Sequence, residues 1–538
     1  MKFAITALAC LPVAFAGLGD RFSMWDMQQK AALKAVKRDV DPNTLYPTYN
    51  LSTPVDHLHD DCLYEPHSDA KFPQRYWFDA SHYKKGGPVI VLLGGETAGT
   101  DRLPYLQKGI LAQLAQATNG IGVVLEHRYY GKSYPTSDFS TANLRFLTTD
   151  QSNADIAYFA ENIVFPGLEG QDLTSKTTPY ISYGGSYAGA QSAILRTQYP
   201  NQIWGGIGSS GVPQAIWDYW EYFAPIAQYG PPACINAQQT LIQIIDAILI
   251  SKNDPKLTQQ LKTAFGLGNL THNDDFANTV STGMSNWQSL NWDPAVNSNA
   301  FYQYCDLITN NTIAYPATAG LHDQVASLIK ASGVRTSAQT VTGMLNLIGY
   351  VNDTAVSSCT QTQDQCFGAR NPTYYAQDNL DQDWRLWPYQ YCTQWGFLQT
   401  GSGVPRNQRP LLSRLIDLKY SSLICVQAFN ITTPPDTQAI NKYGGNRIAY
   451  DRLALIDGEI DPWRPAGPHG FSLGAPHRDS TTNRPFHLIP KAVHHWDENG
   501  LFANQTTAAL PPSQIKEVQS LEATFVKAWV QQFHAQKA

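Results

Sequence analysis

Between residues 72 and 211, short runs of apolar residues alternate with stretches that have helical spacing. The apolar runs cover residues 87–96, 120–131, 179–183 and 204–211. Between them, residues 105–118 and 150–163 carry the periodicity of helices. Continuous apolar strands that alternate with helices are typical of a parallel sheet covered on both faces. The first part of the chain is therefore predicted to be an α/β domain.

The pattern changes after residue 212 and returns near the C-terminus. Residues 213–440 contain helical patches, with a clear helix predicted at 239–250, and many Gln, Asn and Thr. Strand-like runs come back at 447–463 and 484–500, and an amphipathic helix at 512–534 closes the chain. We therefore expect one sheet domain in two sequence pieces, residues 39–212 and 441–538, with a mainly helical cap of residues 213–440 inserted between them.

The N-terminus has the features of a secretory signal. Lys2 precedes a largely apolar run that ends in the small-x-small pattern Ala14-Phe15-Ala16, so residues 1–16 are predicted to be removed. Residues 17–38 end in Lys37-Arg38, a dibasic pair that either marks a propeptide or is two surface charges. No later run of about 18 apolar residues is present, so we expect no membrane partner. The predicted location is outside the cell, or in an acidic vacuolar or lysosomal-type compartment.

Composition narrows the class of protein further. The 538 residues include only 15% charged side chains and have a net charge of −6, which excludes a basic face for nucleic acid. Seven cysteines follow the signal, so at most three internal disulfides and one leftover thiol are expected, with the pairing left open. The oligomeric state is also left open. Six sequons are candidates for glycosylation: Asn50, Asn269, Asn310, Asn352, Asn430 and Asn504.

The segment TPYISYGGSYAGAQ places one serine, Ser186, between small residues where a predicted strand becomes a helix. An ordinary tight turn is the plainer interpretation. The other is a nucleophile held on a strained strand-to-helix turn, where its neighbours must be small. The glycine expected two residues after the serine is replaced by Ala188, and Gly189 follows. Alanine still fits such a turn.

Two further residues complete a catalytic arrangement in the order that α/β-hydrolases use. Asp461 and His494 each follow a predicted strand, after Ser186 in the chain. A serine hydroxyl needs an imidazole to take its proton and a carboxylate to orient that imidazole. We therefore predict Ser186, His494 and Asp461 as a triad. The backbone N–H groups of Tyr187 and Gly95 are the predicted oxyanion hole.

Other histidines are alternative candidates for the catalytic base or for a metal ligand. His495 is expected to point away from His494, and His127 to be structural. His57 and His59 suggest a metal, but no His-Glu-x-x-His or Cys-x-x-Cys pattern supports one, so no metal and no cofactor are expected.

Several motifs together carry a family resemblance. They are FPQRYWF at 72–78, LLGGE at 92–96, EHRYYGKSYP at 126–135, GGSYAGA at 184–190, WPYQYCTQWGFLQ at 387–399, DGEIDPW at 457–463 and AVHHW at 492–496. In family order over nearly the whole mature chain, they resemble the serine peptidases that include lysosomal Pro-X carboxypeptidase and dipeptidyl peptidase II. Length, signal and the dibasic pair look most like the secreted fungal acid prolyl endopeptidases.

The resemblance implies an α/β-hydrolase core with a helical cap, and cleavage after proline in peptides or proteins at acidic pH. It places the nucleophile, acid and base on Ser186, Asp461 and His494. A proline ring needs a small apolar pocket, for which Trp463 and Trp496 are the candidate walls. Endopeptidase action is the favoured reading. An exopeptidase of the same family, a secreted carboxylesterase and a non-enzymatic adhesion relative are the alternatives.

Overall fold

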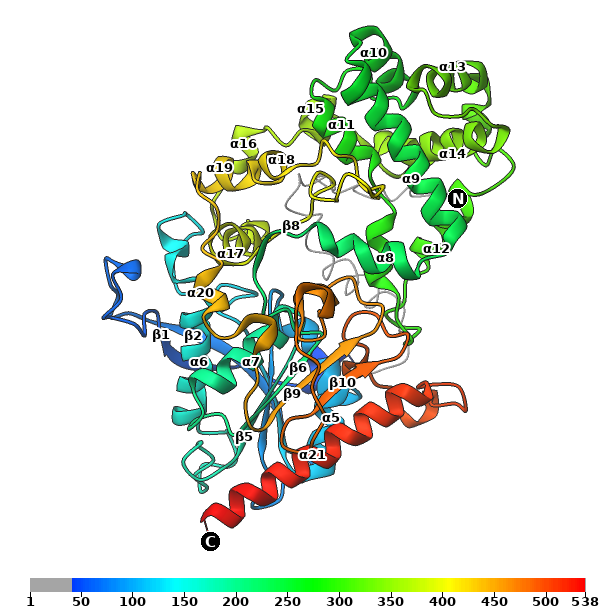
Figure 1. Cartoon of the computed structure of the whole chain (residues 1–538). Coiled ribbons are helices and arrows are strands. Elements are labelled where there is room, and N and C mark those ends of the chain that lie inside the picture. The colour runs from blue at the N-terminus through cyan, green and yellow to red at the C-terminus, as the bar shows by residue number, and fades with distance from the viewer. Residues whose placement is uncertain (1–40, 538) are drawn as a thin grey trace, which may run out of the picture.

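The protein is described here by a computed structural model that covers residues 41–537, so the predicted signal 1–16 and propeptide 17–38 lie outside the described residues. Its centre is an eight-stranded sheet with the order β1-β2-β4-β3-β5-β6-β9-β10 (Figure 1). The strands are β1 Tyr49–Pro54, β2 Lys71–Asp79, β3 Val89–Leu93, β4 Ile121–Leu125, β5 Tyr180–Gly185, β6 Gly205–Ser209, β9 Leu453–Gly458 and β10 Phe486–Ile489. β2 runs antiparallel to β1 and β4, and all the other neighbours are parallel. The predicted α/β-hydrolase fold is confirmed.

The apolar runs form central strands because both of their faces are covered. In β3, Ile90 and Leu92 pack on the layer that contains α5 (Ile110–Thr118) and α21 (Ser513–Lys537). Val89, Val91 and Leu93 pack on the opposite layer, which contains α6 (Thr149–Asn162) and α7 (Tyr187–Gln198). The alternation of side chains along a strand thus supplies both apolar faces from one continuous run.

Two predicted helices differ from the observed ones at their ends. The predicted helix 105–118 is two helices, α4 (Pro104–Gln107) and α5, which are separated at Gly109. The helix predicted at 239–250 begins earlier, as α9 (Pro232–Asp246), and continues as a π-helical turn, Ala247–Lys252. This stretch of 21 residues is long and apolar enough to cross a membrane. Half of its most apolar part is buried inside the protein, as in a core helix.

The part of the chain between β6 and β9 is mainly helical, as expected. Its longer helices, besides α9, are α10 (Pro255–Ala264), α11 (Asn273–Val280), α12 (Ala300–Ile308), α13 (His322–Ser332) and α14 (Ala338–Thr354). A short parallel pair, β7 (Ile216–Asp218) with β8 (Gly396–Leu398), is its only sheet among the described residues. Figure 1 shows these helices above the carboxyl ends of the core strands. The boundaries at 212 and 440 stay a prediction.

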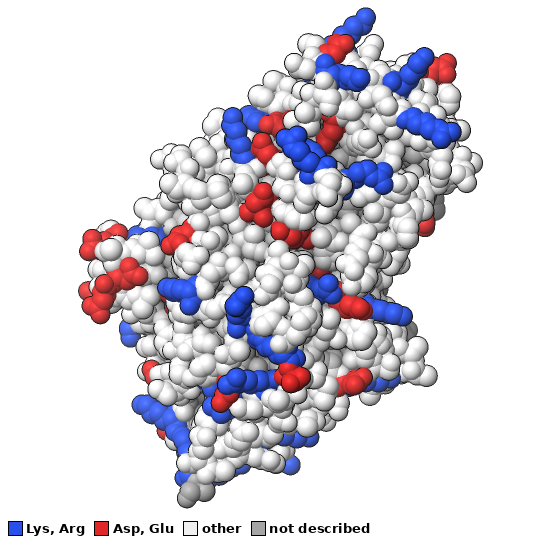
Figure 2. Space-filling view, in the orientation of Figure 1, with Lys and Arg blue, Asp and Glu red and all other residues white. Residues whose placement is uncertain are grey.

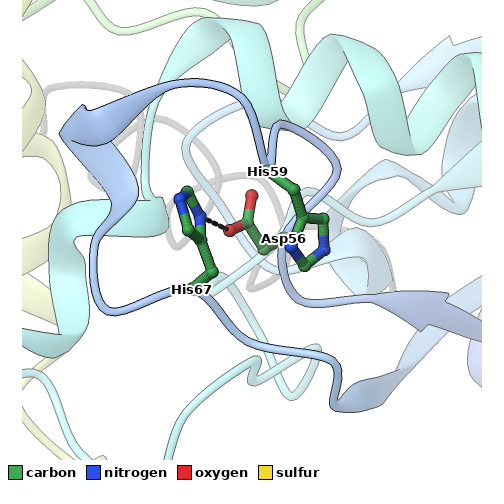
Figure 3. Close-up of side chains that lie close together, drawn as sticks. All are labelled: Asp56, His59 and His67. Atoms are coloured by element: carbon green, nitrogen blue, oxygen red, sulfur yellow. Dashed lines mark hydrogen bonds and ion pairs between the residues drawn. The ribbon is translucent and has the colours of Figure 1, made fainter.

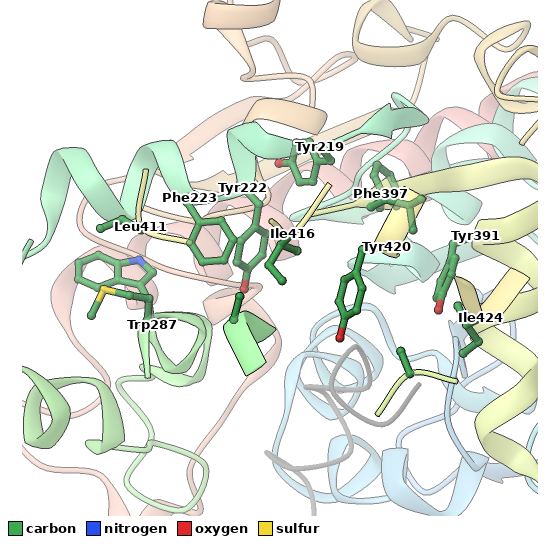
Figure 4. Packing of buried hydrophobic residues seen from close by; sticks show 14 of the residues in the cluster. Tyr219, Tyr222, Phe223, Trp287, Tyr391, Phe397, Leu411, Ile416, Tyr420 and Ile424 are labelled. Atoms are coloured by element: carbon green, nitrogen blue, oxygen red, sulfur yellow. The ribbon is translucent and has the colours of Figure 1, made fainter. Parts of the chain in front are cut away.

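The cap and the sheet domain share one apolar core. Tyr187 and Ile194 of α7 belong to the same buried cluster as Tyr219, Tyr222 and Phe397 of the cap (Figure 4). Burial of apolar surface is the main stabilising term in such packing. The cap is therefore held against the site end of the sheet by the same kind of interior that holds the sheet to its helices.

Three disulfides form in the cap, and one further cysteine of residues 41–537 is a free thiol. The pairs are Cys234–Cys305, Cys359–Cys366 and Cys392–Cys425, while Cys62 is free and exposed. Five sequon asparagines are exposed: Asn50, Asn269, Asn310, Asn430 and Asn504. Asn352 lies inside α14 and its side-chain amide donates to the Ile348 carbonyl at 2.8 Å. Charges of both signs are scattered over the face in Figure 2.

Candidate active site

Ser186 lies on the tight turn between β5 and α7. Its backbone has φ 59° and ψ −124°, a conformation that non-glycine residues rarely adopt. A Cβ at Gly184 would lie 2.0 Å from the Ala188 carbonyl oxygen, and one at Gly185 would lie 2.1 Å from the Glu498 carboxylate. The turn therefore requires glycine at both positions, and the strained backbone raises the hydroxyl above the strand ends.

The structure brings Ser186, His494 and Asp461 together, although they are far apart in the sequence. The distance from His494 Nε2 to Ser186 Oγ is 2.8 Å, and that from His494 Nδ1 to Asp461 Oδ2 is 2.7 Å. Asp461 follows β9 and His494 follows β10, so parallel strands deliver both to the same edge of the sheet as Ser186. This chain of contacts can take the proton of the hydroxyl and orient the imidazole that receives it.

The environment of His494 favours its neutral form. Burial lowers the pKa of His494, and the positive charge of the neighbouring His495 lowers it further, while Asp461 acts in the opposite direction. The net direction is downward. A base must be unprotonated before it can accept a proton, so this shift extends the working range of the base toward lower pH.

His495 does not point away from His494, as the sequence led us to expect. The two ring centroids are 4.5 Å apart. His495 has a left-handed backbone, φ 35° and ψ 53°, so the alternation of side chains in extended chain does not apply. Its Nδ1 lies 3.0 Å from Glu498 Oε2. Burial alone would lower the pKa of His495, but the Glu498 carboxylate raises it.

Gly95, one of the two predicted oxyanion-hole residues, lies against Ala188, the residue that follows the other, Tyr187. Tyr187 is the first residue of α7, so its N–H is one of the unpaired donors of a helix start. Gly95 follows β3 with φ 67°, and a Cβ there would lie 3.3 Å from that of Ala188. The preceding N–H, of Gly94, already donates to Leu125 at 2.9 Å. The Gly95 N–H is therefore the next donor beside the turn of Ser186.

Trp463 is the better placed of the two candidate pocket walls. Its ring centroid lies 6.4 Å from that of His494, and its backbone N–H donates to Asp461 Oδ1 at 2.8 Å. The ring of Tyr219 stacks on that of Trp463 with centroids 5.3 Å apart. The rings of Tyr222 and Phe397 pack against it in T-shaped arrangements, with centroid distances of 5.3 and 5.2 Å. These cap aromatics could not be found from sequence spacing, because the fold alone brings them to Trp463 and so near His494.

Trp496 is held by hydrogen bonds to the cap rather than by stacking beside His494. Its indole N–H donates to the Leu290 carbonyl at 2.9 Å, and its own carbonyl accepts from the Trp292 indole at 2.8 Å. It contacts apolar clusters on two sides. Trp496 thus joins the cap to the loop that carries His494.

The first three residues of the motif EHRYYG make buried contacts that hold neighbouring segments of the sheet domain together. Glu126 is fully buried and accepts hydrogen bonds from Arg75, Ser133 and the Gly99 backbone N–H. Arg128 forms a buried ion pair with Asp155, in which Nη2 lies 2.6 Å from Oδ1. These contacts give Glu126 and Arg128 a structural role. His127 Nε2 lies 3.0 Å from the Tyr187 hydroxyl, and burial lowers its pKa to about 4, so it stays neutral.

The triad has no set of metal ligands beside it among the described residues. One group of His and Asp side chains in that part of the chain has donor atoms close enough to hold a metal, and it lies in the loop after β1. The chemistry that this arrangement of serine, histidine and aspartate offers is acyl transfer through a serine hydroxyl.

Comparisons with known proteins agree with this chemistry. A family model described as serine carboxypeptidase S28 matches residues 60–508. A probable extracellular serine carboxypeptidase of Arthroderma benhamiae is 54% identical over 499 residues, which cover 92% of this chain and 69% of that one. Serine protease vicPa of Bipolaris victoriae is 30% identical, over 87% of each chain. Thymus-specific serine protease of Mus musculus is 25% identical, over 79% of this chain and 78% of that one.

Proposed function

Because this chain belongs to the serine carboxypeptidase S28 family, we propose that it cleaves peptide bonds on the carboxyl side of proline through a serine acyl-enzyme. Membership confirms the family resemblance that the sequence motifs carried, and makes the protein a serine peptidase. Proline specificity, endopeptidase action and an acidic working pH are the further parts of the proposal.

The observation that carries the proposal is the line of contacts from Asp461 through His494 to Ser186. In the proposed reaction, Ser186 Oγ attacks the carbonyl carbon of the proline residue itself, and His494 Nε2 takes the hydroxyl proton. Negative charge develops on the carbonyl oxygen and is stabilised by the N–H groups of Tyr187 and Gly95. His494 then protonates the leaving amine, and water resolves the acyl-enzyme with His494 again acting as base.

A cluster of aromatic rings beside His494 is the basis for the proposed preference for proline. A proline ring is compact and apolar, and its nitrogen has no N–H to offer the enzyme. Trp463, with Tyr219 and Phe397 packed against it, places apolar ring atoms next to His494. Such a surface favours the ring over a flexible or charged side chain at the residue before the cut.

Acidic working conditions are supported by the lowered pKa of His494. Burial and the charge of His495 keep the base neutral at a pH where an ordinary imidazole is protonated. Secretion is supported by the relative from Arthroderma benhamiae, which is described as extracellular, and by three disulfides, which persist in oxidising compartments.

Carboxypeptidase action is the second candidate function. The family model and the relative of 54% identity both carry that description, which favours removal of the residue after a penultimate proline. The two modes use the same triad and differ in whether the substrate needs a free carboxyl terminus. The triad geometry is equally compatible with both.

A blocked peptide separates the two modes. A peptide with one internal proline, acetylated at its N-terminus and amidated at its C-terminus, is incubated with the mature protein at pH 4–5, and products are read by mass spectrometry. Endopeptidase action gives a cut after proline that Ser186→Ala loses. If only the peptide with a free C-terminus is cut, the enzyme is a carboxypeptidase. If neither is cut after proline, the proposed specificity is wrong.

A further inference from the structure

Three donor side chains meet in the loop between β1 and β2, remote in sequence from the triad. The donor atoms of Asp56, His59 and His67 all lie within 4.8 Å of one another. His67 Nδ1 is 2.8 Å from Asp56 Oδ2, and the His59 and His67 ring centroids are 5.3 Å apart. Figure 3 shows the carboxylate of Asp56 between the two imidazoles. Two imidazoles and one carboxylate are a common set of ligands for Zn²⁺.

The carboxylate of this group is held in place by the fold. The Asp56 side chain is fully buried, and its Oδ1 accepts from Gln151 Nε2 at 2.6 Å and from the Leu58 backbone N–H at 2.9 Å. Gln151 belongs to α6 and also accepts from the His57 backbone N–H at 2.9 Å. One oxygen is therefore used to fix the carboxylate, and the other, Oδ2, faces the histidine. Metal-binding carboxylates are oriented by outer hydrogen bonds of this kind.

We propose that Asp56, His59 and His67 form a binding site for a divalent transition-metal ion, with Zn²⁺ as the representative ion. The site fastens the loop between β1 and β2 onto α6. Three protein ligands leave at least one position for water, as in zinc sites that are not closed by a fourth side chain.

The movement that binding requires is small. Ligand atoms in a tetrahedral zinc site are separated by about 3.3 Å, since each bond is about 2.0–2.1 Å. The contact of 2.8 Å between Asp56 and His67 must open slightly, and the remaining separations, of at most 4.8 Å, must close. His59 is exposed and His67 is partly exposed, so both rings can turn without disturbing the interior. Asp56, which cannot move, is the fixed point of the site.

The surroundings attract a cation. Asp60, Asp61 and Glu65 are exposed on the same loop. Acidic atoms gather at the left edge of Figure 2, where Figure 1 places this loop beyond β1. Clustered charge of one sign raises the local concentration of counter-ions. No Lys or Arg occurs between Asp56 and Ala70, and a cation that contacts the loop from outside is Arg145, which donates to the Tyr64 and Pro66 carbonyls.

Sequence spacing alone led us to expect no metal, and the reason is now visible. The tempting pair was His57 and His59, but His57 turns inward and its Nε2 lies 2.8 Å from Asp155. The second histidine of the group is instead His67, which lies eight residues after His59 and forms no short motif with it. The plainer interpretation of the group is an ion pair between His67 and Asp56 that holds the loop without any metal. That interpretation predicts no saturable binding.

Metal binding by the whole protein decides between the two interpretations. The mature protein is treated with EDTA, dialysed, and titrated with Zn²⁺ at pH 7 by calorimetry. We expect one ion per chain. The affinity should fall by roughly tenfold or more in His59→Ala and be lost in the His59→Ala/His67→Ala double variant. Co²⁺ should give visible d–d absorption in the wild type that the double variant lacks.

The control is His322→Ala. His322 Nδ1 lies 3.1 Å from Asp323 Oδ1, an exposed histidine–carboxylate pair without a third ligand. This variant should bind Zn²⁺ like the wild type. Circular dichroism and peptidase activity in the absence of metal establish that each variant is folded. Absence of saturable binding, or equal binding by the double variant, would overturn the proposal, because the ion would then be held elsewhere, including at His494.

Thermal unfolding gives an independent readout. An ion that binds only the folded chain raises Tm in proportion to the logarithm of its concentration. At a hundredfold excess over Kd, we expect Zn²⁺ to raise the Tm of the wild type by about 2–5 °C. The double variant should show no rise. A rise of equal size in both proteins would contradict a site in this loop.

Discussion

The rings of His494 and His495 lie 4.5 Å apart, and their pKa values move in opposite directions. Two adjacent cations repel each other, so only one of the two rings readily holds a proton. The Glu498 carboxylate, 3.0 Å from His495 Nδ1, assigns that proton to His495. The charge that His495 carries then lowers the pKa of His494 and keeps the base free.

Replacing His495 should move the acidic limit of activity toward neutral pH. His495→Gln removes the neighbouring positive charge and leaves the Glu498 carboxylate to act on His494, and both changes raise the pKa of His494. The acidic limb of kcat/KM should therefore shift upward by about one pH unit, equivalent to about 1.4 kcal/mol. The measurement is the pH profile of kcat/KM on a proline substrate.

His322→Gln, at an exposed histidine, is the control for that profile and should leave the limb in place. An unchanged acidic limb in His495→Gln, with an unchanged thermal stability, would mean that His495 does not influence the base. A uniform loss of activity at all pH values would indicate a structural role only.

Asp461→Asn should leave the fold intact but nearly abolish turnover. The amide cannot orient the imidazole that donates from Nδ1, nor stabilise the imidazolium that forms, so kcat should fall by about 10⁴. The control is Asp457→Asn. Asp457 makes a similar buried contact with His469, at 2.6 Å, away from the nucleophile. Comparable losses in both variants would show that the effect is general damage to the core and would remove Asp461 from the triad.

Much of the core could be predicted from the sequence because its signals are local. A strand such as β3 is apolar at every position, and the turn at Ser186 needs glycines on its N-terminal side, so both are visible in a few letters. The order of Ser186, Asp461 and His494 follows from the strand ends. These features depend on the backbone of one element at a time.

The rest depends on how distant segments pack. Nothing in the spacing of the cap predicts that Tyr219 and Phe397 converge on Trp463, or that Cys234 pairs with Cys305 across 71 residues. The prediction that His495 points away from His494 was wrong for a more local reason. One residue in left-handed conformation changes the side of the chain that its side chain faces. At His495, unlike at Ser186, no neighbouring glycine marks the residue as one with positive φ.

The two candidate pocket tryptophans should respond differently to truncation. Trp463→Ala removes the ring that Tyr219 stacks on beside His494, so the preference for proline over alanine before the cut should fall about tenfold, or about 1.4 kcal/mol. Trp496→Ala should lower Tm, because Trp496 is hydrogen-bonded to Leu290 and Trp292, but it should leave that preference unchanged. The measurements are the ratio of kcat/KM values for matched peptides and thermal unfolding. A larger loss of preference in Trp496→Ala would reverse the assignment.

Glu522 should make the protein more stable in acid than at neutral pH. Glu522 is a fully buried residue of α21, and neither of its carboxylate oxygens has a hydrogen-bond partner among the described residues. Burial, and then the nearby Asp497 and Glu498, raise its pKa well above the ordinary 4.5. Asp497 shifts in the same direction, to about 6, because of its burial.

The sign follows from proton linkage. A carboxyl whose pKa is raised by folding contributes stability that is fully present below the unfolded pKa and is lost as pH rises through the folded pKa. For Glu522, the free energy of unfolding should fall from about pH 4.5 upward, at about 1.4 kcal/mol per pH unit for each such proton. Glu522→Gln should flatten that slope, which is the readout, since a buried amide adds a cost that does not depend on pH. Glu517→Gln, at an exposed position of the same helix, should keep the wild-type slope. Chemical denaturation at pH 4.5, 5.5 and 6.5 measures all three proteins, and a slope that Glu522→Gln leaves unchanged would place the acid-favouring protons on other groups.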